Sequence, residues 1–188
     1  MTKIRDYSGR LLNHIEALYR PGERALAIEL AEALGCAISD TGFRDGDNDS
    51  FLAVHPDPDD RNLSNNAFYI SQMTPEHLAL EDALRITVEH DQSLQELLAD
   101  YRALARSRPF GVPHFGLRYN SLADVEDAIE AIETRISPRL GERIHTRIYH
   151  PGDTDAAGGE AVQAFIHQDV IVSGAFLFGQ IIELQKQS

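Results

Sequence analysis

The sequence has a single cysteine, Cys36, among its 188 residues. One cysteine cannot form a disulfide within the chain, so no disulfide framework of the secreted type is available. A cytoplasmic location is therefore the default expectation.

Long apolar runs are also missing. No stretch approaches the roughly 20 apolar residues of a membrane-spanning helix. Residues 1–10, "MTKIRDYSGR", are polar and contain no apolar signal-peptide core. We therefore expect neither a membrane partner nor a membrane anchor.

Basic residues are scarce, with 17 Lys and Arg against 30 Asp and Glu and a net charge of −13. Such a surface repels phosphate backbones, which argues against nucleic acid as a partner. The remaining composition, 43% apolar and 25% charged, is typical of a soluble globular protein. The length suits one large domain or two small fused modules.

Several common site motifs are incomplete or missing. The acidic run that begins at Asp45 has Pro56 where a calcium loop needs a bidentate glutamate. The glycine-rich residues 152–160 lack the lysine and the following Ser or Thr of a phosphate-binding loop. No Ser-His-Asp or Cys-His nucleophile arrangement is evident either.

The first half of the chain predicts the order strand, helix, strand, strand, strand. Residues 11–19 alternate around His14 as a strand, and residues 23–34 are strong helix formers followed by Gly35, a suitable C-terminal cap. Three further strands are expected at residues 36–39, 51–55 and 66–73.

The second half predicts the same order. His114 opens an alternating strand at 114–119, one hundred residues after His14. A helix over 121–136 begins at Ser121 with Asp124 three residues later, a variant of the capping box. Strands are expected at 141–150, 161–172 and 179–185. Two units with one element order indicate an internal repeat.

Between the repeats, residues 74–108 predict a helical pair. Thr74 followed by Pro75 marks the first helix start, and Ser93 with Glu96 predicts a capping box for the second helix. The second helix carries an apolar stripe of Leu94, Leu97, Leu98, Tyr101 and Leu104. The expected units are thus 1–73, 74–110 and 111–188, and the connector either covers one end of a cleft or contacts a second subunit.

Two stretches, "HIEALYRPGERALAIELAEALGCAI" and "HFGLRYNSLADVEDAIEAIE", together with the closing "FGQIIELQ", resemble the vicinal oxygen chelate superfamily. This superfamily includes glyoxalase I, extradiol dioxygenases, fosfomycin-resistance enzymes and bleomycin-binding proteins. The resemblance covers most of the chain outside residues 74–108. It implies an α+β fold of two paired βαβββ modules, whose curled mixed sheets surround a shared cleft.

The resemblance also implies a metal site. Position by position, the first strands supply His14 and His114, and the last strand supplies Glu183. The corresponding strand of the first half has no carboxylate. Imidazole and carboxylate ligands suit Fe(II), which is favoured, with Mn(II), Ni(II) or Zn(II) as alternatives. A carboxylate between Ile182 and Leu184 needs a partner if it is buried, and a cation is a natural one.

Each of these residues also has a simpler interpretation. His14 and His114 could be strand histidines satisfied by hydrogen bonds, and Glu183 could face water at a sheet edge. His55 and His167 lie on third strands, where each is either a proton donor or acceptor of the cleft or a surface histidine. The aromatic residues Tyr69, Phe115 and Phe176 either line the substrate cleft or pack in the core.

These features predict a metal-dependent enzyme acting on a small, vicinally oxygenated molecule. A set of two histidines and one glutamate favours an Fe(II) dioxygenase of extradiol type. The stretch before Glu183 lacks the tyrosine usual in those enzymes, which leaves a glyoxalase-like lyase or isomerase as one alternative. The second alternative is a metal-free protein that binds small molecules or drugs.

Overall fold

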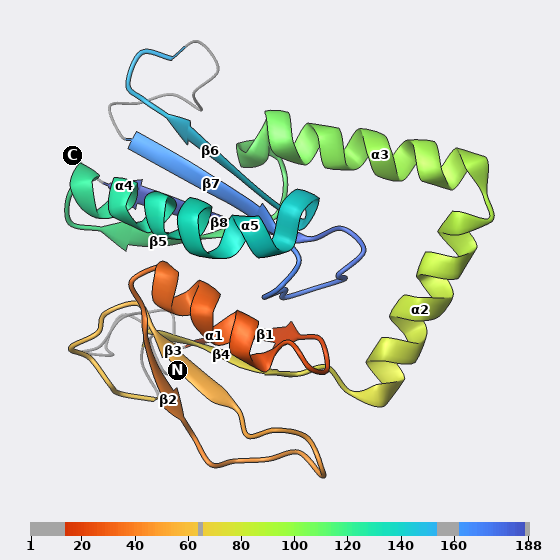
Figure 1. The fold of residues 1–188 in the computed structure, drawn as a ribbon, viewed down its shortest axis with the longest axis horizontal. Coiled ribbons are helices and arrows are strands. Elements are labelled where there is room, and N and C mark those ends of the chain that lie inside the picture. Colours follow the sequence, from red (N-terminus) through yellow and green to blue (C-terminus); the bar gives the residue numbers. More distant parts are fainter. Residues whose placement is uncertain (1–13, 64–65, 154–161, 187–188) are drawn as a thin grey trace, which may run out of the picture.

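The computed structural model describes residues 14–63, 66–153 and 162–186. It is an α+β protein with two four-stranded mixed sheets, neither of which closes into a barrel (Figure 1). Each sheet belongs to one half of the chain, and an arm of two helices connects the halves.

The first sheet has the strand order β1-β4-β3-β2. The first and last strands run parallel, with His14 opposite Ala67 and Glu16 opposite Tyr69, and the other pairs are antiparallel. Helix α1 connects the first two strands. The elements are β1 (His14–Tyr19), α1 (Arg24–Ala33), β2 (Ala37–Asp40), β3 (Leu52–His55) and β4 (Ala67–Gln72).

The second sheet repeats this topology as β5-β8-β7-β6. Here β5 runs parallel to β8, with His114 opposite Ile181 and Gly116 opposite Glu183. The strand–helix–strand–strand–strand order predicted for each half is therefore present in both. The elements are β5 (His114–Tyr119), α4 (Leu122–Ala131), β6 (Ile144–Tyr149), β7 (Val162–Gln168) and β8 (Gln180–Lys186).

The strand predicted at 161–172 is too long, because β7 ends at Gln168. The Gln168 side-chain oxygen accepts the backbone N–H groups of Val170 and Ile171 at 2.7 and 2.8 Å. These groups are thereby satisfied without a partner strand. The chain turns away, and Val172 instead makes an isolated antiparallel bridge with Leu18 of the first half.

The helix predicted at 121–136 begins as expected and ends later. Ser121 and Asp124 form the reciprocal capping box, with bonds of 3.1 and 3.0 Å. After α4 the chain widens into a π-helical segment, Ile132–Ile136, and continues as α5 (Ser137–Leu140). Proline lacks the N–H that a regular helix needs, and the wider turn ends at Ile136, two residues before Pro138.

The helical pair predicted between the repeats is present as α2 (Pro75–Glu89) and α3 (Gln92–Ser107), followed by a short 3₁₀ turn at Pro109–Gly111. Thr74 caps α2 by accepting the His77 N–H. The predicted capping role of Ser93 is wrong. Asp91 is the cap of α3, because its carboxylate lies nearer the helix start and accepts the Leu94 N–H at 3.0 Å.

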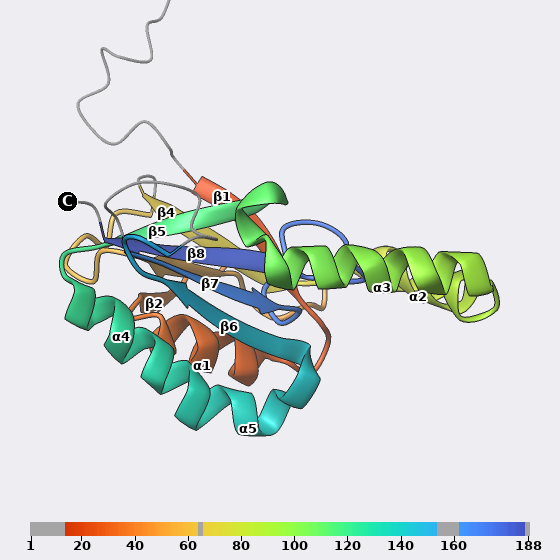
Figure 2. The same ribbon diagram turned by 90° about the horizontal axis from the view of Figure 1, so that it is seen from above.

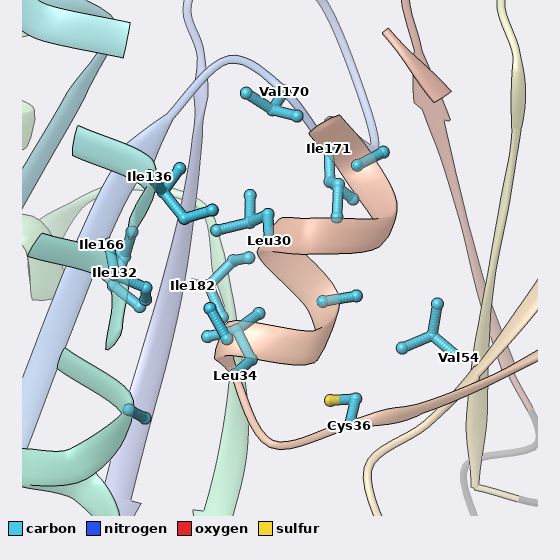
Figure 3. Close-up of a cluster of buried hydrophobic side chains, with 14 of the residues drawn as sticks. Leu30, Leu34, Cys36, Val54, Ile132, Ile136, Ile166, Val170, Ile171 and Ile182 are labelled. Carbon is cyan, nitrogen blue, oxygen red and sulfur yellow. The ribbon is translucent and has the colours of Figure 1, made fainter. Parts of the chain in front are cut away.

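Helices α1, α4 and α5 lie side by side against one face of the two sheets (Figure 2). Between them and the sheets lies a single core that draws on both halves of the chain. Leu30 and Leu34 of α1 meet side chains of the second half there (Figure 3). The second half contributes Ile132, Ile136, Ile166, Ile171 and Ile182 among others.

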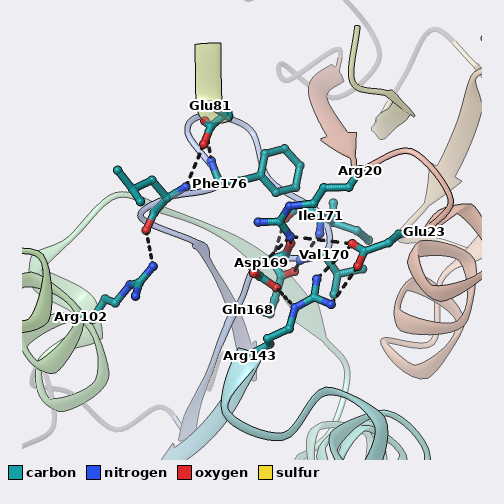
Figure 4. Close-up of polar contacts among 11 residues, drawn as sticks. Arg20, Glu23, Glu81, Arg102, Arg143, Gln168, Asp169, Val170, Ile171 and Phe176 are labelled. Atoms are coloured by element: carbon teal, nitrogen blue, oxygen red, sulfur yellow. Dashed lines mark hydrogen bonds and ion pairs between the residues drawn. The ribbon is translucent and has the colours of Figure 1, made fainter. Parts of the chain in front are cut away.

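A polar cluster also joins the halves next to this core (Figure 4). Asp169 accepts from Arg143 Nε at 2.8 Å and from Arg20 Nη1 at 3.2 Å. Arg143 also pairs with Glu23 at 2.8 Å. Arg20 and Glu23 come from the first half, and Arg143 and Asp169 come from the second. The cluster therefore fixes how the two halves meet.

Replacing Asp169 by Asn is expected to lower the free energy of unfolding by about 1–2 kcal/mol, because two charge-assisted hydrogen bonds weaken. Chemical denaturation at pH 7 measures the change. The matched control is Asp82→Asn, whose partner Arg85 lies 3.4 Å away with both side chains about half exposed. The control should change stability by no more than about 0.5 kcal/mol. Equal effects of the two variants would contradict the prediction.

In the part of the chain that the structure describes, no helix combines the length and apolar character needed to cross a membrane.

Candidate functional site

The site lies on the sheet faces that turn away from α1 and α4. Successive strand side chains point to opposite faces. On β5, Leu117 is buried in the main core, whereas His114 and Gly116 alternate with it and are exposed. The same alternation on β1 exposes His14 and Glu16 and buries Ala17.

His114 and Glu183 meet on the second sheet. Glu183 lies on β8 directly opposite Gly116, and its Oε2 atom is 3.3 Å from His114 Nε2. His114 Nδ1 is 2.8 Å from the carbonyl oxygen of Val112. A carbonyl only accepts, so Nδ1 carries a proton. In a neutral imidazole the Nε2 lone pair then faces the carboxylate, and only a proton or a cation between the two atoms relieves their repulsion.

The Glu183 carboxylate is held on its other side. Gln163 Nε2 on β7 donates to Glu183 Oε1 at 2.6 Å. Gly116 leaves space above the other oxygen, since a Cβ atom at this position would lie 3.4 Å from Glu183 Oε2. One oxygen is therefore fixed by a neutral amide, and the other is presented to His114.

In the first sheet, His14 and Glu16 lie on the same face of β1. The rings of His14 and Tyr69 are in edge-to-face contact, 5.5 Å between centroids. Glu16 Oε1 accepts a hydrogen bond from Ser71 Oγ at 2.8 Å, and the Tyr69 hydroxyl donates to the Leu63 carbonyl. Tyr69 is therefore next to His14, on the same face of the first sheet.

Glu16 is a candidate that sequence reasoning missed. The registers of the two sheets make Glu16 equivalent to Gly116 and Tyr69 equivalent to Glu183. The first half thus carries its carboxylate on the first strand, and the second half carries it on the last strand. The available signal was the spacing of two residues after His14, which puts both side chains on one strand face.

His55 and His167 are also equivalent, since His55 pairs with Ala37 of β2 and His167 with His145 of β6. Interpreting them as surface histidines is wrong, because their exposed fractions are 0% and 9%. His55 Nε2 lies 3.1 Å from Ser39 Oγ, and His167 Nε2 donates to the Phe178 carbonyl at 3.3 Å. The Nδ1 atoms of both are buried without a hydrogen-bond partner among the described residues.

Burial lowers the pKa of both histidines below the ordinary 6.5, and for His55 the nearby Arg61 lowers it further. His167 lies beneath the carboxyl-terminal end of α3, close to Arg106, His145 and Arg147. In this setting the neutral ring is favoured over the charged one.

Stability should therefore fall as the pH drops below about 6.5, where the histidines of the unfolded chain take up protons that the folded chain resists. Each such histidine lowers the free energy of unfolding by up to about 1.4 kcal/mol per pH unit, until its folded-state pKa is reached. Urea denaturation between pH 7.5 and 5 measures the slope. Combining His55→Gln with His167→Gln should flatten it, and an unchanged slope in that double variant would contradict the assignment.

A depression of about 420 Å³ lies beside His114, between β1, β5 and the turn at 173–179. Phe115 and the 46%-exposed Phe178 line it, together with Ile15 and Tyr101. Phe115 reaches the depression from the edge of β5, but its side chain alternates with His114 and packs against the main core and Phe68.

Phe176 lies elsewhere. It is 3% exposed, packs with Met73 and Val172, and has the Arg20 guanidinium 4.5 Å above its ring. The turn directs Phe176 toward α2, whereas the next aromatic, Phe178, contacts Tyr101 of α3. Phe176 therefore lies in a small core, away from His114.

Within residues 14–63, 66–153 and 162–186, no three or more His, Cys, Asp or Glu side chains are grouped closely enough to hold a metal ion. Of the three predicted ligands, the structure brings His114 and Glu183 together. His14 occupies the equivalent position on the other sheet, next to Tyr69.

No protein-family model matches the sequence, and no curated protein matches it. Among solved structures, the chain is similar to the crystal structure of protein PA1353 from Pseudomonas aeruginosa. The two share 10% sequence identity with a TM-score of 0.41, over 93% of this chain and 97% of that one. This likeness assigns neither a family nor a function to the chain.

Proposed function

We propose that this protein is a metal-dependent enzyme of the vicinal oxygen chelate type, acting on a small molecule with neighbouring oxygen atoms. The pairing of His114 with Glu183 carries the proposal. Their facing atoms, 3.3 Å apart, suit two ligands of one ion, because ligands bound at about 2.0–2.2 Å and roughly at right angles lie near 3 Å from each other.

The surroundings of this pair support the same role. Metal-binding histidines usually donate their second ring N–H to a carbonyl or carboxylate, as His114 does to Val112. Gln163 orients Glu183 in the way that ligating carboxylates are commonly held. His14 is proposed as the third ligand, from its equivalent register in the first sheet. Fe(II) is favoured, with Mn(II), Ni(II) or Zn(II) as alternatives.

A bound ion would polarise substrate oxygens and stabilise negative charge on them. The protein would supply the remaining parts of the site. Phe178 and Tyr69 offer aromatic surface beside the histidines, which would orient a ring or acyl group. His55 and His167 are not proposed as proton carriers, because both are buried and their Nε2 atoms face Ser39 Oγ and the Phe178 carbonyl.

An Fe(II) dioxygenase of extradiol type is the favoured reaction class, since the last strand of the first half has no carboxylate ligand. Glu16 favours the glyoxalase-like lyase or isomerase as the second candidate. It is exposed on the face that carries His14 and has one oxygen held by Ser71, an arrangement that suits a general base. A metal-free binding protein is the third candidate, and the depression beside His114 would be its ligand site.

One experiment separates these candidates. Protein purified without oxygen is analysed for metals and then tested for oxygen uptake with catechols and other vicinal diols or enediols. Bound iron with oxygen uptake supports the dioxygenase, and bound metal with isomerisation of an enediol precursor supports the lyase or isomerase. Protein without stoichiometric metal, whose thermal stability does not increase with Fe(II), Mn(II), Ni(II) or Zn(II), would overturn the proposal.

A further inference from the structure

The α2–α3 arm projects from the body of the protein and leaves most of its apolar side chains uncovered (Figure 1). None of the residues of α2 is buried, and in α3 only Ala105 is. The described residues include ten large apolar side chains that are exposed, and six of them are on these two helices. These are Leu80, Leu84, Ile86, Leu94, Leu97 and Leu104, with exposed fractions of 36–61%.

The two helices do not cover each other. They diverge from the turn at His90 and Asp91, so the angle between them stays open (Figure 1). Helices of this length gain most of their stability from packing an apolar face against a neighbour. An exposed set of leucines of this extent usually marks a contact surface.

Hydrogen bonds hold the arm in a defined position on the body. Glu81 accepts the backbone N–H groups of Phe176 and Leu177 at 3.0 and 3.2 Å, and Arg102 donates to the Leu177 carbonyl at 2.8 Å (Figure 4). The surface is therefore preformed, and the arm would lose little conformational entropy when a partner binds.

A cavity of about 560 Å³ lies in the angle between the helices and the turn. Its apolar lining consists of Met73, Leu78, Val88, Leu98, Ala99, Phe176 and Leu177. Charged side chains line it as well, among them Glu81, Asp82, Arg85 and Glu89 of α2, and none of the six exposed apolar side chains does. The exposed apolar side chains therefore lie outside this angle.

We propose that the arm is the interface of a twofold homodimer, in which the exposed apolar side chains of two arms pack against each other in a bundle of four helices. The 15 residues of α2 and 16 of α3 supply the roughly 20–30 residues per side that a standard interface uses. Two arms bring together the four helices of a bundle, with the exposed apolar side chains of each arm in contact with those of the other. The apolar stripes then become a shared core.

The charges on the arm favour a second copy as the occupant. Helix α2 carries four acidic residues, Glu76, Glu81, Asp82 and Glu89, and one basic residue, Arg85. The end of α3 and its cap carry Arg102, Arg106 and Arg108, with no acidic residue after Asp100. A twofold axis that sets α2 of one copy beside the end of α3 in the other brings opposite charges together twice.

Sedimentation equilibrium of the intact protein tests the proposal. Wild-type protein should have twice the 20.9 kDa mass of one chain at roughly 10–100 µM. Leu97→Glu on α3 and Leu84→Glu on α2 should each raise the dissociation constant by about 100-fold or more, because a charge would enter an apolar interface. Circular dichroism should show unchanged helix content, since both side chains are on the surface.

The matched control is Phe43→Glu, at a side chain 64% exposed on the β2–β3 connection, compared with 61% for Leu97. The control should remain dimeric. A wild-type monomer throughout this range would overturn the proposal, even if another protein co-purified with it. It would also be overturned if the Leu97 and Leu84 variants stayed fully dimeric, or if Phe43→Glu dissociated to the same extent.

Discussion

His114→Ala is expected to weaken the binding of Fe(II), Mn(II) and Zn(II) by more than about 100-fold, because losing even a residue that merely orients a ligand costs 10–100-fold. Among the described residues, only His114 has a ring nitrogen within 3.3 Å of Glu183 Oε2. These two atoms could therefore bind the same ion. Isothermal titration with the metal alone gives both affinity and stoichiometry.

Two further variants make this result specific. Glu183→Gln keeps the shape and the contact with Gln163 but removes the negative charge, and it should weaken metal binding to a similar extent. His150→Ala, at an exposed histidine just after β6, should bind metal as the wild type does. The apo forms should melt close to the wild type, because His114 lies on the surface of β5. Undiminished binding by His114→Ala would show that this histidine has no ligand role.

Leu30→Ala should produce the largest loss of stability, about 2–5 kcal/mol in the free energy of unfolding. Leu30 is fully buried in α1, and its neighbours in the core include residues of the second half such as Ile132 and Ile171 (Figure 3). Truncating it leaves a cavity between the halves that neither can close alone. Urea denaturation at pH 7.5 measures the change.

Leu63→Ala is the control, since Leu63 has the same chemistry but is 40% exposed. It should cost less than about 1 kcal/mol. If the halves instead unfolded separately, Leu30→Ala would show two transitions, and the shared core would not act as one cooperative unit.

The periodic pattern of the sequence was enough to predict the repeated element order, because alternation and helical spacing are local properties. Element ends depended on side-chain hydrogen bonds that the pattern does not reveal. Gln168 ended β7 early by binding backbone groups, and Asp91 replaced Ser93 as the cap of α3. Both corrections concern polar residues that compete for backbone N–H groups.

Of the candidate site, His114 and Glu183 were predicted from the sequence but Glu16 was not. The pairing of His114 with Glu183 depends on the register of β5 against β8, which follows from packing of the whole sheet. The resemblance to a known family supplied that pairing, whereas composition and spacing did not. The spacing of Glu16 from His14 puts both side chains on one strand face, but its hydrogen bond to Ser71 of β4 depends on the register of the assembled sheet.

The burial of His55 and His167 could not be predicted from their own strands either. His167 is covered by the end of α3, a segment about 60 residues earlier in the chain. The burial of His167 therefore depends on how the α2–α3 arm packs on the second sheet.

X-ray absorption of protein loaded with one equivalent of Zn(II) or Fe(II) tests the central claim most directly, because it counts the imidazole ligands of the ion. The ion should have two imidazole ligands in the wild-type protein and one in His14→Ala, with the oxygen ligands retained. A wild-type ion without imidazole ligands, or the same two imidazoles in His14→Ala, would contradict a metal site shared between the two halves.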